Sequence, residues 1–232
     1  MDQSCEGMPK YCIDMVLCID VSKSMAPLMR TVKEQMIRLP NALIHRMQNL
    51  RKHISRFRVR ILVFNNDVAG IEHAVQMTDF FTLPARQDEF RHLVNSIEAD
   101  GSSKSEYGLE ALAYAMASDW VRPTATTKCR HIIALWTDSA PSKEFSPKLR
   151  SRYDPQLPST FEELTAWWGD EPEEPLAKMN YYTKRLLIFS PDAGVWRSIS
   201  ESWENVIPVH TVAGQGLSEQ DFREIISILI EL

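Results

Sequence analysis

The chain has no uninterrupted apolar stretch near the roughly 18 residues that a membrane-spanning helix needs. It also lacks a basic excess, because its formal net charge is −5, and this argues against general binding of nucleic acid. The first ten residues, MDQSCEGMPK, hold no basic segment followed by an apolar one, so no secretory signal peptide is expected. These absences predict a soluble cytoplasmic protein with no membrane span.

Several motifs of metal and catalytic chemistry are missing too. The cysteines show neither zinc nor redox spacing, and Cys18 and Cys129 fall in or beside apolar segments, as reduced cysteines in a core do. The histidines show no paired spacing for zinc. The G-x-S-x-G pattern of serine hydrolases and the phosphate-binding G-x-x-x-x-G-K-[ST] loop are both absent.

The chain of 232 residues is long enough for one sizeable core, so we expect a single domain over 1–232. Apolar runs alternate with amphipathic stretches, which predicts an α/β fold with a mostly parallel sheet. A segment at 68–83 is expected to add one antiparallel edge strand.

Pro40 lies inside a helical pattern at 25–50, where a kink or a break is expected. The other expected strands are Met15–Ile19, Val59–Phe64, Ile132–Trp136, Arg185–Phe189 and Val206–Val212, and the other expected helices are Gln87–Ile97, Leu109–Trp120, Ala193–Trp203 and Ser218–Leu232.

Polar residues follow the first apolar run. Met15–Ile19 is the kind of strand that is buried on both faces, and it ends abruptly in Asp20, Ser22 and Ser24. In open α/β sheets, ligands bind at the carboxyl ends of the strands. One carboxylate and two hydroxyls form an all-oxygen set suited to a hard cation such as Mg²⁺.

These residues resemble the metal-ion-dependent adhesion (MIDAS) motif of von Willebrand factor A domains, D-x-S-x-S. The resemblance implies a doubly wound sheet with helices on both faces. It also implies that Asp138, which follows Ile132–Trp136 and Thr137, is the last acidic residue of the site; read alone, Asp138 is better explained as the cap of a helix or turn. The second-loop ligand of the family, usually Thr or Asp, corresponds to Ser103 here, which is a departure. Ser102 or Ser105 could take its place.

The family contains adhesion and scaffolding modules. The resemblance therefore implies a non-enzymatic, metal-dependent protein-interaction module that binds Mg²⁺ or Mn²⁺ and whose partner can supply an Asp or Glu to the ion. The expected ligands are Asp20, Ser22, Ser24, Ser103 and Asp138. The segments G-x-x-x-S-E-x-G-L-E-A-L, L-W-T-D and K-R-L-L-I-F-S-P are similar to those of stand-alone cytoplasmic bacterial members, which are thought to act as adaptors.

One enzyme class remains as an alternative. A Mg²⁺-dependent phosphohydrolase of the haloacid-dehalogenase type also begins with an Asp at the end of its first strand, and Thr137 could mimic its second motif. Asp20 would then be the nucleophile. That class needs a second acid two residues later, and this chain has Ser22 there.

The segment at about 140–183 interrupts the alternation of strands and helices with six prolines and an acidic run. Within it, Thr160–Trp168 has the pattern of a capped amphipathic helix. We interpret the segment as an insertion that leaves from the metal edge of the sheet. It is either a solvated loop held down by Trp167 or Trp168, or a lid or partner-specific surface.

Overall fold

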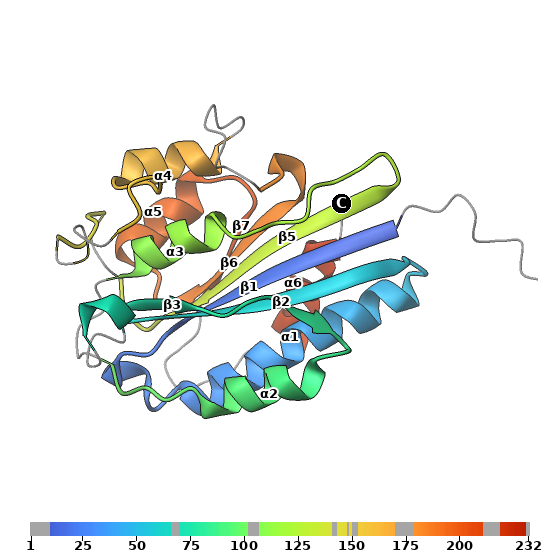
Figure 1. Cartoon of the computed structure of the whole chain (residues 1–232), viewed down its shortest axis with the longest axis horizontal. Helices are drawn as coiled ribbons and strands as arrows, with labels where there is room; N and C mark the ends of the chain where they lie inside the picture. Colours follow the sequence, from blue (N-terminus) through green and yellow to red (C-terminus); the bar gives the residue numbers. More distant parts are fainter. Residues whose placement is uncertain are drawn as a thin grey trace, which may run out of the picture.

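The computed structural model describes residues 10–65, 70–101, 107–140, 143–147, 149, 153–169, 179–210 and 219–230. A central sheet has a layer of helices on each face (Figure 1). The strands are β1 (Lys10–Asp20), β2 (Ile54–Phe64), β3 (Val75–Met77), β4 (Phe81–Leu83), β5 (Thr127–Trp136), β6 (Lys184–Ser190) and β7 (Val206–His210). The helices are α1 (Met29–Asn49), α2 (Gln87–Ser96), α3 (Gly108–Met116), α4 (Phe161–Trp168), α5 (Gly194–Ser202) and α6 (Glu219–Ile230).

The strand order is β3-β2-β1-β5-β6-β7, and all pairs from β2 to β7 are parallel. The first apolar run becomes β1 at the centre, where Leu17 lies between Ile61 of β2 and Ala134 of β5. The predicted antiparallel edge segment is confirmed as two short strands, β3 and β4, which both pair with β2. Its first residues lie outside the described part of the chain.

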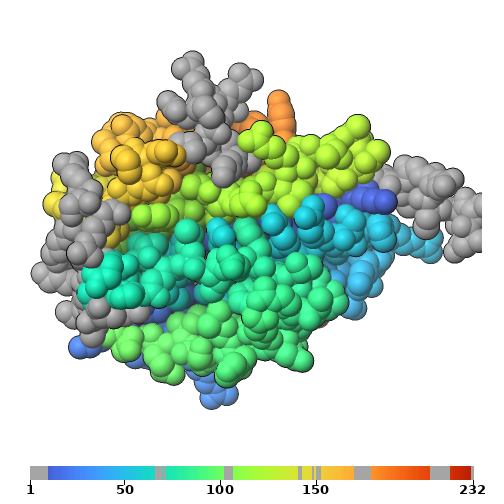
Figure 2. Space-filling model, viewed as in Figure 1, coloured from blue at the N-terminus to red at the C-terminus, as the bar shows by residue number. Residues whose placement is uncertain are grey.

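The two faces of the sheet are covered by different helices. Side chains of α1, α2 and α6 form one apolar cluster with the sheet, and side chains of α3, α4 and α5 form the other. In Figure 2, α2, in green, lies on the side of the molecule that is turned toward the viewer, next to the segment that contains β3 and β4. This is the doubly wound α/β arrangement expected from the sequence.

Helix α1 differs from its prediction in one respect. A short 3-10 helix, Lys23–Met25, precedes it, and the helix then runs from Met29 to Asn49 with Pro40 inside it. Of the two expected outcomes at Pro40, the break is excluded, and the kink stays a prediction. Proline removes one helical hydrogen bond, but the buried stripe of α1 outweighs this loss by packing against the sheet. That stripe consists of Met29, Val32, Met36, Leu39, Pro40, Leu43 and Met47.

The described part of segment 140–183 packs on the α3 and α5 layer, with α4 on the outside of it (Figure 1). The Thr160 hydroxyl accepts a hydrogen bond from the Glu163 amide, and the Glu163 carboxylate accepts one from the Ser159 amide, which confirms the predicted cap. Trp168 stacks on Trp203 with ring centroids 5.5 Å apart. These contacts confirm that Trp168 holds this part of the segment against the domain, and the role as a lid or partner-specific surface stays a prediction.

Among the described helices, none is long and apolar enough to cross a membrane. The described cysteines, Cys12, Cys18 and Cys129, are buried and unpaired, as a core position predicts.

Candidate functional site

Asp20 is the last residue of β1, and its side chain is fully buried at the carboxyl edge of the sheet. One carboxylate oxygen, Oδ1, accepts hydrogen bonds from the Ser22 amide and from Asn65 Nδ2, both at 2.8 Å. The other, Oδ2, accepts one from Thr137 Oγ1 at 2.7 Å. Because these donors follow the carboxyl ends of β1, β2 and β5, Asp20 ties three neighbouring strand ends together.

The two motif serines lie beside Asp20 on the turn that leads into the 3-10 helix. Ser22 Oγ and Ser24 Oγ are 3.1 Å apart, and Ser24 Oγ donates to Asp138 Oδ1 at 3.0 Å. Ser22 is buried, whereas Ser24 is exposed. The structure thus brings Asp20, Ser22, Ser24 and Asp138 to one edge of the sheet, although 114 positions separate Ser24 from Asp138 in the sequence.

Asp138 follows β5 and is half-buried. Burial raises the pKa of its carboxyl group, and the nearby charge of Asp20 raises it further, while the hydrogen bond from Ser24 acts in the opposite direction. Two carboxylates at one partly desolvated edge repel each other, so this edge favours a bound cation.

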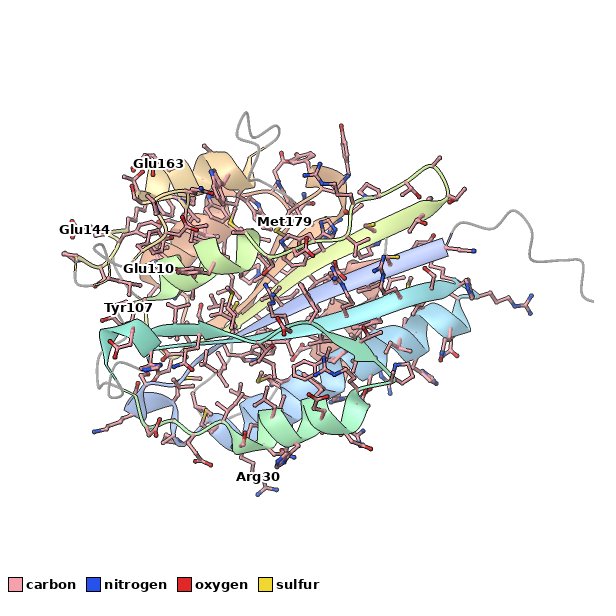
Figure 3. All side chains as sticks on the ribbon, viewed as in Figure 1. Arg30, Tyr107, Glu110, Glu144, Glu163 and Met179 are labelled. Carbon is pink, nitrogen blue, oxygen red and sulfur yellow. The ribbon has the colours of Figure 1, made fainter. Side chains whose placement is uncertain are left out.

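The predicted loop ligand Ser103 lies outside the described residues, as do its alternatives Ser102 and Ser105. The residues on either side of this loop are described. The Gly101 amide donates to the Val21 carbonyl at 2.9 Å, and the Tyr107 amide donates to Asn65 Oδ1 at 3.2 Å. Both flanks therefore contact residues next to Asp20. Figure 3 labels Tyr107 at the end of the molecule where the strands reach their carboxyl ends.

The backbone around position 101 leaves no room for a side chain. A Cβ atom there would lie 2.1 Å from the Asn65 carbonyl oxygen and 2.7 Å from that of Val21. Both atoms belong to the backbone of strand ends and cannot move aside cheaply. The close approach of this loop to the strand ends therefore depends on glycine.

Asn65 is the residue that the sequence interpretation missed. Its side chain donates to Asp20 and accepts from the Tyr107 amide, so it joins the β1 end to the start of α3. Its backbone has φ 70°, a left-handed conformation that asparagine tolerates better than most residues. The sequence signal that was available is its position directly after a buried apolar run. Asp20 and Thr137 directly follow apolar runs in the same way.

The site is rich in oxygen and poor in nitrogen and sulfur. Among the described residues, no group of three or more His, Cys, Asp or Glu side chains could hold a metal ion. The edge instead combines two carboxylates with two hydroxyls. Such a set suits hard cations, which prefer oxygen, better than zinc or copper.

No protein-family model and no curated protein sequence matches the chain. Solved structures do match in fold. The pilus adhesin SpaC from Lactobacillus rhamnosus GG aligns with a TM-score of 0.55 and 11% identity over 97% of this chain and 32% of its own. Proximal thread matrix protein 1 from the mussel byssus aligns with a TM-score of 0.50 and 12% identity over 96% of this chain and 47% of its own.

Another structure of the mussel protein, described as having a zinc-occupied MIDAS motif, aligns with a TM-score of 0.49 and 12% identity over 96% of this chain and 48% of its own. The chain thus spans less than half the length of each of these proteins. At such low identity, the likeness to the adhesin and the matrix protein shows the fold alone: this chain has an α/β fold of the von Willebrand factor A type.

Proposed function

We propose that the chain is a metal-dependent protein-interaction module, a single von Willebrand factor A domain over 1–232 with an insertion at about 140–183. It binds Mg²⁺ or Mn²⁺ at the carboxyl edge of the sheet and acts as a cytoplasmic adaptor. Asp20, Ser22, Ser24 and Asp138 hold the ion, with Ser103 as the loop ligand. The observation that carries the proposal is the row of oxygens from Ser22 through Ser24 to Asp138.

The spacing of these oxygens fits the ion. Oxygen ligands about 2.1 Å from Mg²⁺ and at right angles to each other lie about 3.0 Å apart. The two separations in the row are 3.1 Å and 3.0 Å. Both separations are compatible with adjacent corners of an octahedron, and hydrogen bonds between the same groups have similar lengths.

Asp20 supports the site in a different way. Its two oxygens accept hydrogen bonds from Ser22, Asn65 and Thr137 and are shielded from solvent. This arrangement suits a carboxylate that fixes the strand ends and adds negative charge behind the ion. It does not suit the nucleophile of a phosphohydrolase, which needs an oxygen free to attack phosphorus. The position of Ser22 two residues later also disfavours that alternative.

A partner carboxylate can complete the coordination. Mg²⁺ prefers six oxygen ligands and usually keeps several waters, so a site built from a few side chains leaves positions open. An Asp or Glu of another protein would gain a charge-assisted contact there. The net charge of −5 favours a protein partner over nucleic acid.

The proposal is tested by titrating the metal-free protein with MgCl₂ and with MnCl₂ in a calorimeter. We expect one site in the wild type and at least about tenfold weaker binding in Ser24→Ala, since a charged-group contact is worth about 1.5–3 kcal/mol. Ser24 is exposed, so this variant should fold. The matched control is Ser96→Ala, an exposed serine at the end of α2, which should bind like the wild type.

Equal affinities of the wild type and Ser24→Ala would contradict the assigned ligands. A second measurement addresses function: proteins captured by the wild type in Mg²⁺ should be lost in chelator and absent with Ser24→Ala. Hydrolysis of a generic phosphomonoester that requires both Mg²⁺ and Asp20 would instead favour the phosphohydrolase.

A further inference from the structure

Four cationic side chains lie near the amino ends of the strands, opposite the candidate metal site. Lys52 stands just before β2, Lys128 and Arg130 are in β5, and Arg185 is the second residue of β6. Side chains alternate along a strand, so Arg130 shares the face of Ile132 and Ala134, and Arg185 shares that of Leu187. This is the face covered by α1 and α6. We call these four residues the amino-edge cluster.

Arg130 lies at the bottom of the cluster. It is 4% exposed, and its Nε and Nη2 atoms are buried without a hydrogen-bond partner. Its guanidinium carbon lies 5.8 Å from the centre of the Tyr11 ring, and Lys52 Nζ lies 5.6 Å from the same centre. Buried polar atoms are almost always paired in folded proteins, and an unpaired charged donor is costly. These two donors therefore point to a missing acceptor.

Among the described residues, no carboxylate balances the positive charges that act on Arg185 and Lys52 beside Arg130. Burial lowers the pKa of Arg130, Arg185 and Lys52. The charge of Arg130 lowers the pKa of Arg185 and Lys52 further, and Lys128 adds to the effect on Lys52. Within the described part of the chain, no carboxylate is among the groups that shift these three pKa values. Like charges are thus gathered in a partly desolvated place.

The four residues of the cluster differ in their exposure to solvent. Lys128 is exposed at the rim and Lys52 is half-buried, while the two arginines lie deeper. Lys52 also donates to the carbonyl of Ile230, the last residue of α6, at 3.0 Å. Figure 2 shows the beginnings of β1, β2 and β5, in blue, cyan and yellow-green, close together at the right-hand end of the molecule. Solvent therefore reaches the cluster at Lys128 and Lys52.

We propose that the amino-edge cluster binds a small phosphate-bearing anion. A phosphate group carries up to two negative charges and several acceptor oxygens, which matches two unmet donors on Arg130 and the neighbouring cations. Guanidinium groups bind such oxyanions through two parallel hydrogen bonds. The site is separate from the candidate metal site and takes a ligand of opposite charge. The source is either inorganic phosphate or the phosphate of a small organic ester.

The test is calorimetric titration of the whole chain in chelator, which removes any contribution from the metal site. Sodium phosphate and glycerol 3-phosphate are the probes, and sodium chloride at the same ionic strength is the reference. We expect saturable binding of a phosphate probe, and tighter binding of the ester than of the free ion would identify an organic ligand. Lys128→Gln and Arg130→Gln should weaken binding by about tenfold to a hundredfold, the range for losing a charged hydrogen bond.

Arg130→Gln changes a buried residue and can impair folding, so the result for the exposed Lys128→Gln decides the test. The matched control is Arg91→Gln, which removes an exposed positive charge from α2. It should bind phosphate like the wild type. The proposal is overturned if phosphate acts no more strongly than chloride, or if Lys128→Gln and Arg91→Gln bind equally well.

Discussion

Replacing Asp138 by asparagine should have opposite effects on stability with and without the metal ion. The substitution keeps the shape of the side chain and removes one of the two carboxylate charges at the edge. Because burial and the Asp20 charge raise the pKa of Asp138, the charged form is unfavourable in the metal-free fold. Asparagine should therefore stabilise the metal-free protein and weaken the metal-bound one.

In chelator, the size of the effect follows from two contributions. Two unit charges 4 Å apart interact by about 1 kcal/mol in water and about 4 kcal/mol near a protein surface. Asp138 is half-buried and screened, so we take about 1–2 kcal/mol for the relieved repulsion. The hydrogen bond that the exposed Ser24 donates becomes weaker when its acceptor is neutral, and this costs about 0.5–1 kcal/mol of stability. The difference between these two ranges makes the metal-free variant more stable by up to about 1.5 kcal/mol.

With Mg²⁺ the order reverses. A ligand at a hundredfold excess over its Kd adds about 2.7 kcal/mol to the free energy of unfolding, and one at its Kd adds only about 0.4 kcal/mol. If the variant binds Mg²⁺ a hundredfold more weakly, it should be less stable than the wild type by about 1–2 kcal/mol. For a chain of this size, that lowers the melting temperature by about 2–8 °C.

Thermal melts of both proteins in chelator and in MgCl₂ measure this reversal. The matched control is Asp79→Asn, an exposed carboxylate that follows β3, which should shift the melting temperature equally in both conditions. A shift of the same sign and size for Asp138→Asn in both conditions would refute the reasoning, because it would show that the ion does not use Asp138.

Three further variants test the surroundings of the site. Asp20→Asn should lower the free energy of unfolding in chelator as well, by about 1–3 kcal/mol in urea denaturation, because three donors lose a charged acceptor; unchanged stability in chelator would contradict this. Asn65→Ala should cost about 1–2 kcal/mol more than Asn65→Gly, because only glycine accepts φ 70° without strain; equal losses would show that the conformation matters little. Burial lowers the pKa of His131 below its ordinary 6.5, and its Nδ1 accepts from the Asn180 amide. Denaturation at several pH values should therefore show wild-type stability falling as the pH drops below about 6.5, where the unfolded chain takes up a proton first, and His131→Gln should reduce this dependence.

The sequence predicted the sheet well because its parallel strands are buried on both faces. Strands such as β1 and β5 need continuous apolar runs, and these runs are visible without a structure. The ends of helices were less certain, since α3 stops at Met116 rather than Trp120. At Pro40 the sequence did not decide between a kink and a break, because the local cost of proline competes with the burial of a whole helix face, which local sequence does not reveal.

Part of the candidate site could also be predicted, for the same reason. Asp20 and Asp138 follow apolar strands, so parallel pairing places them at one edge. Asn65 escaped notice because its role depends on a contact with Asp20 across the β1–β2 pair and on a positive φ, and neither leaves a pattern in the sequence. The packing of α4 was predicted in part: the sequence named Trp167 or Trp168 as its anchor, but not the partner Trp203, which lies in a segment with no shared periodicity.

The hydrogen bonds around Asp20 bear on how an ion would enter the site. Asp20 is held by donors from the ends of β1, β2 and β5, so the deepest part of the edge is fixed before any ion arrives. Among the described residues, the outer part is held by the hydroxyl contacts from Ser22 to Ser24 and from Ser24 to Asp138. Hydroxyls rotate easily, and an ion needs their lone pairs while leaving the backbone in place. Ion binding should therefore need little reorganisation of the protein. Most of the free energy of ion binding should then remain available to stabilise the contact with a partner.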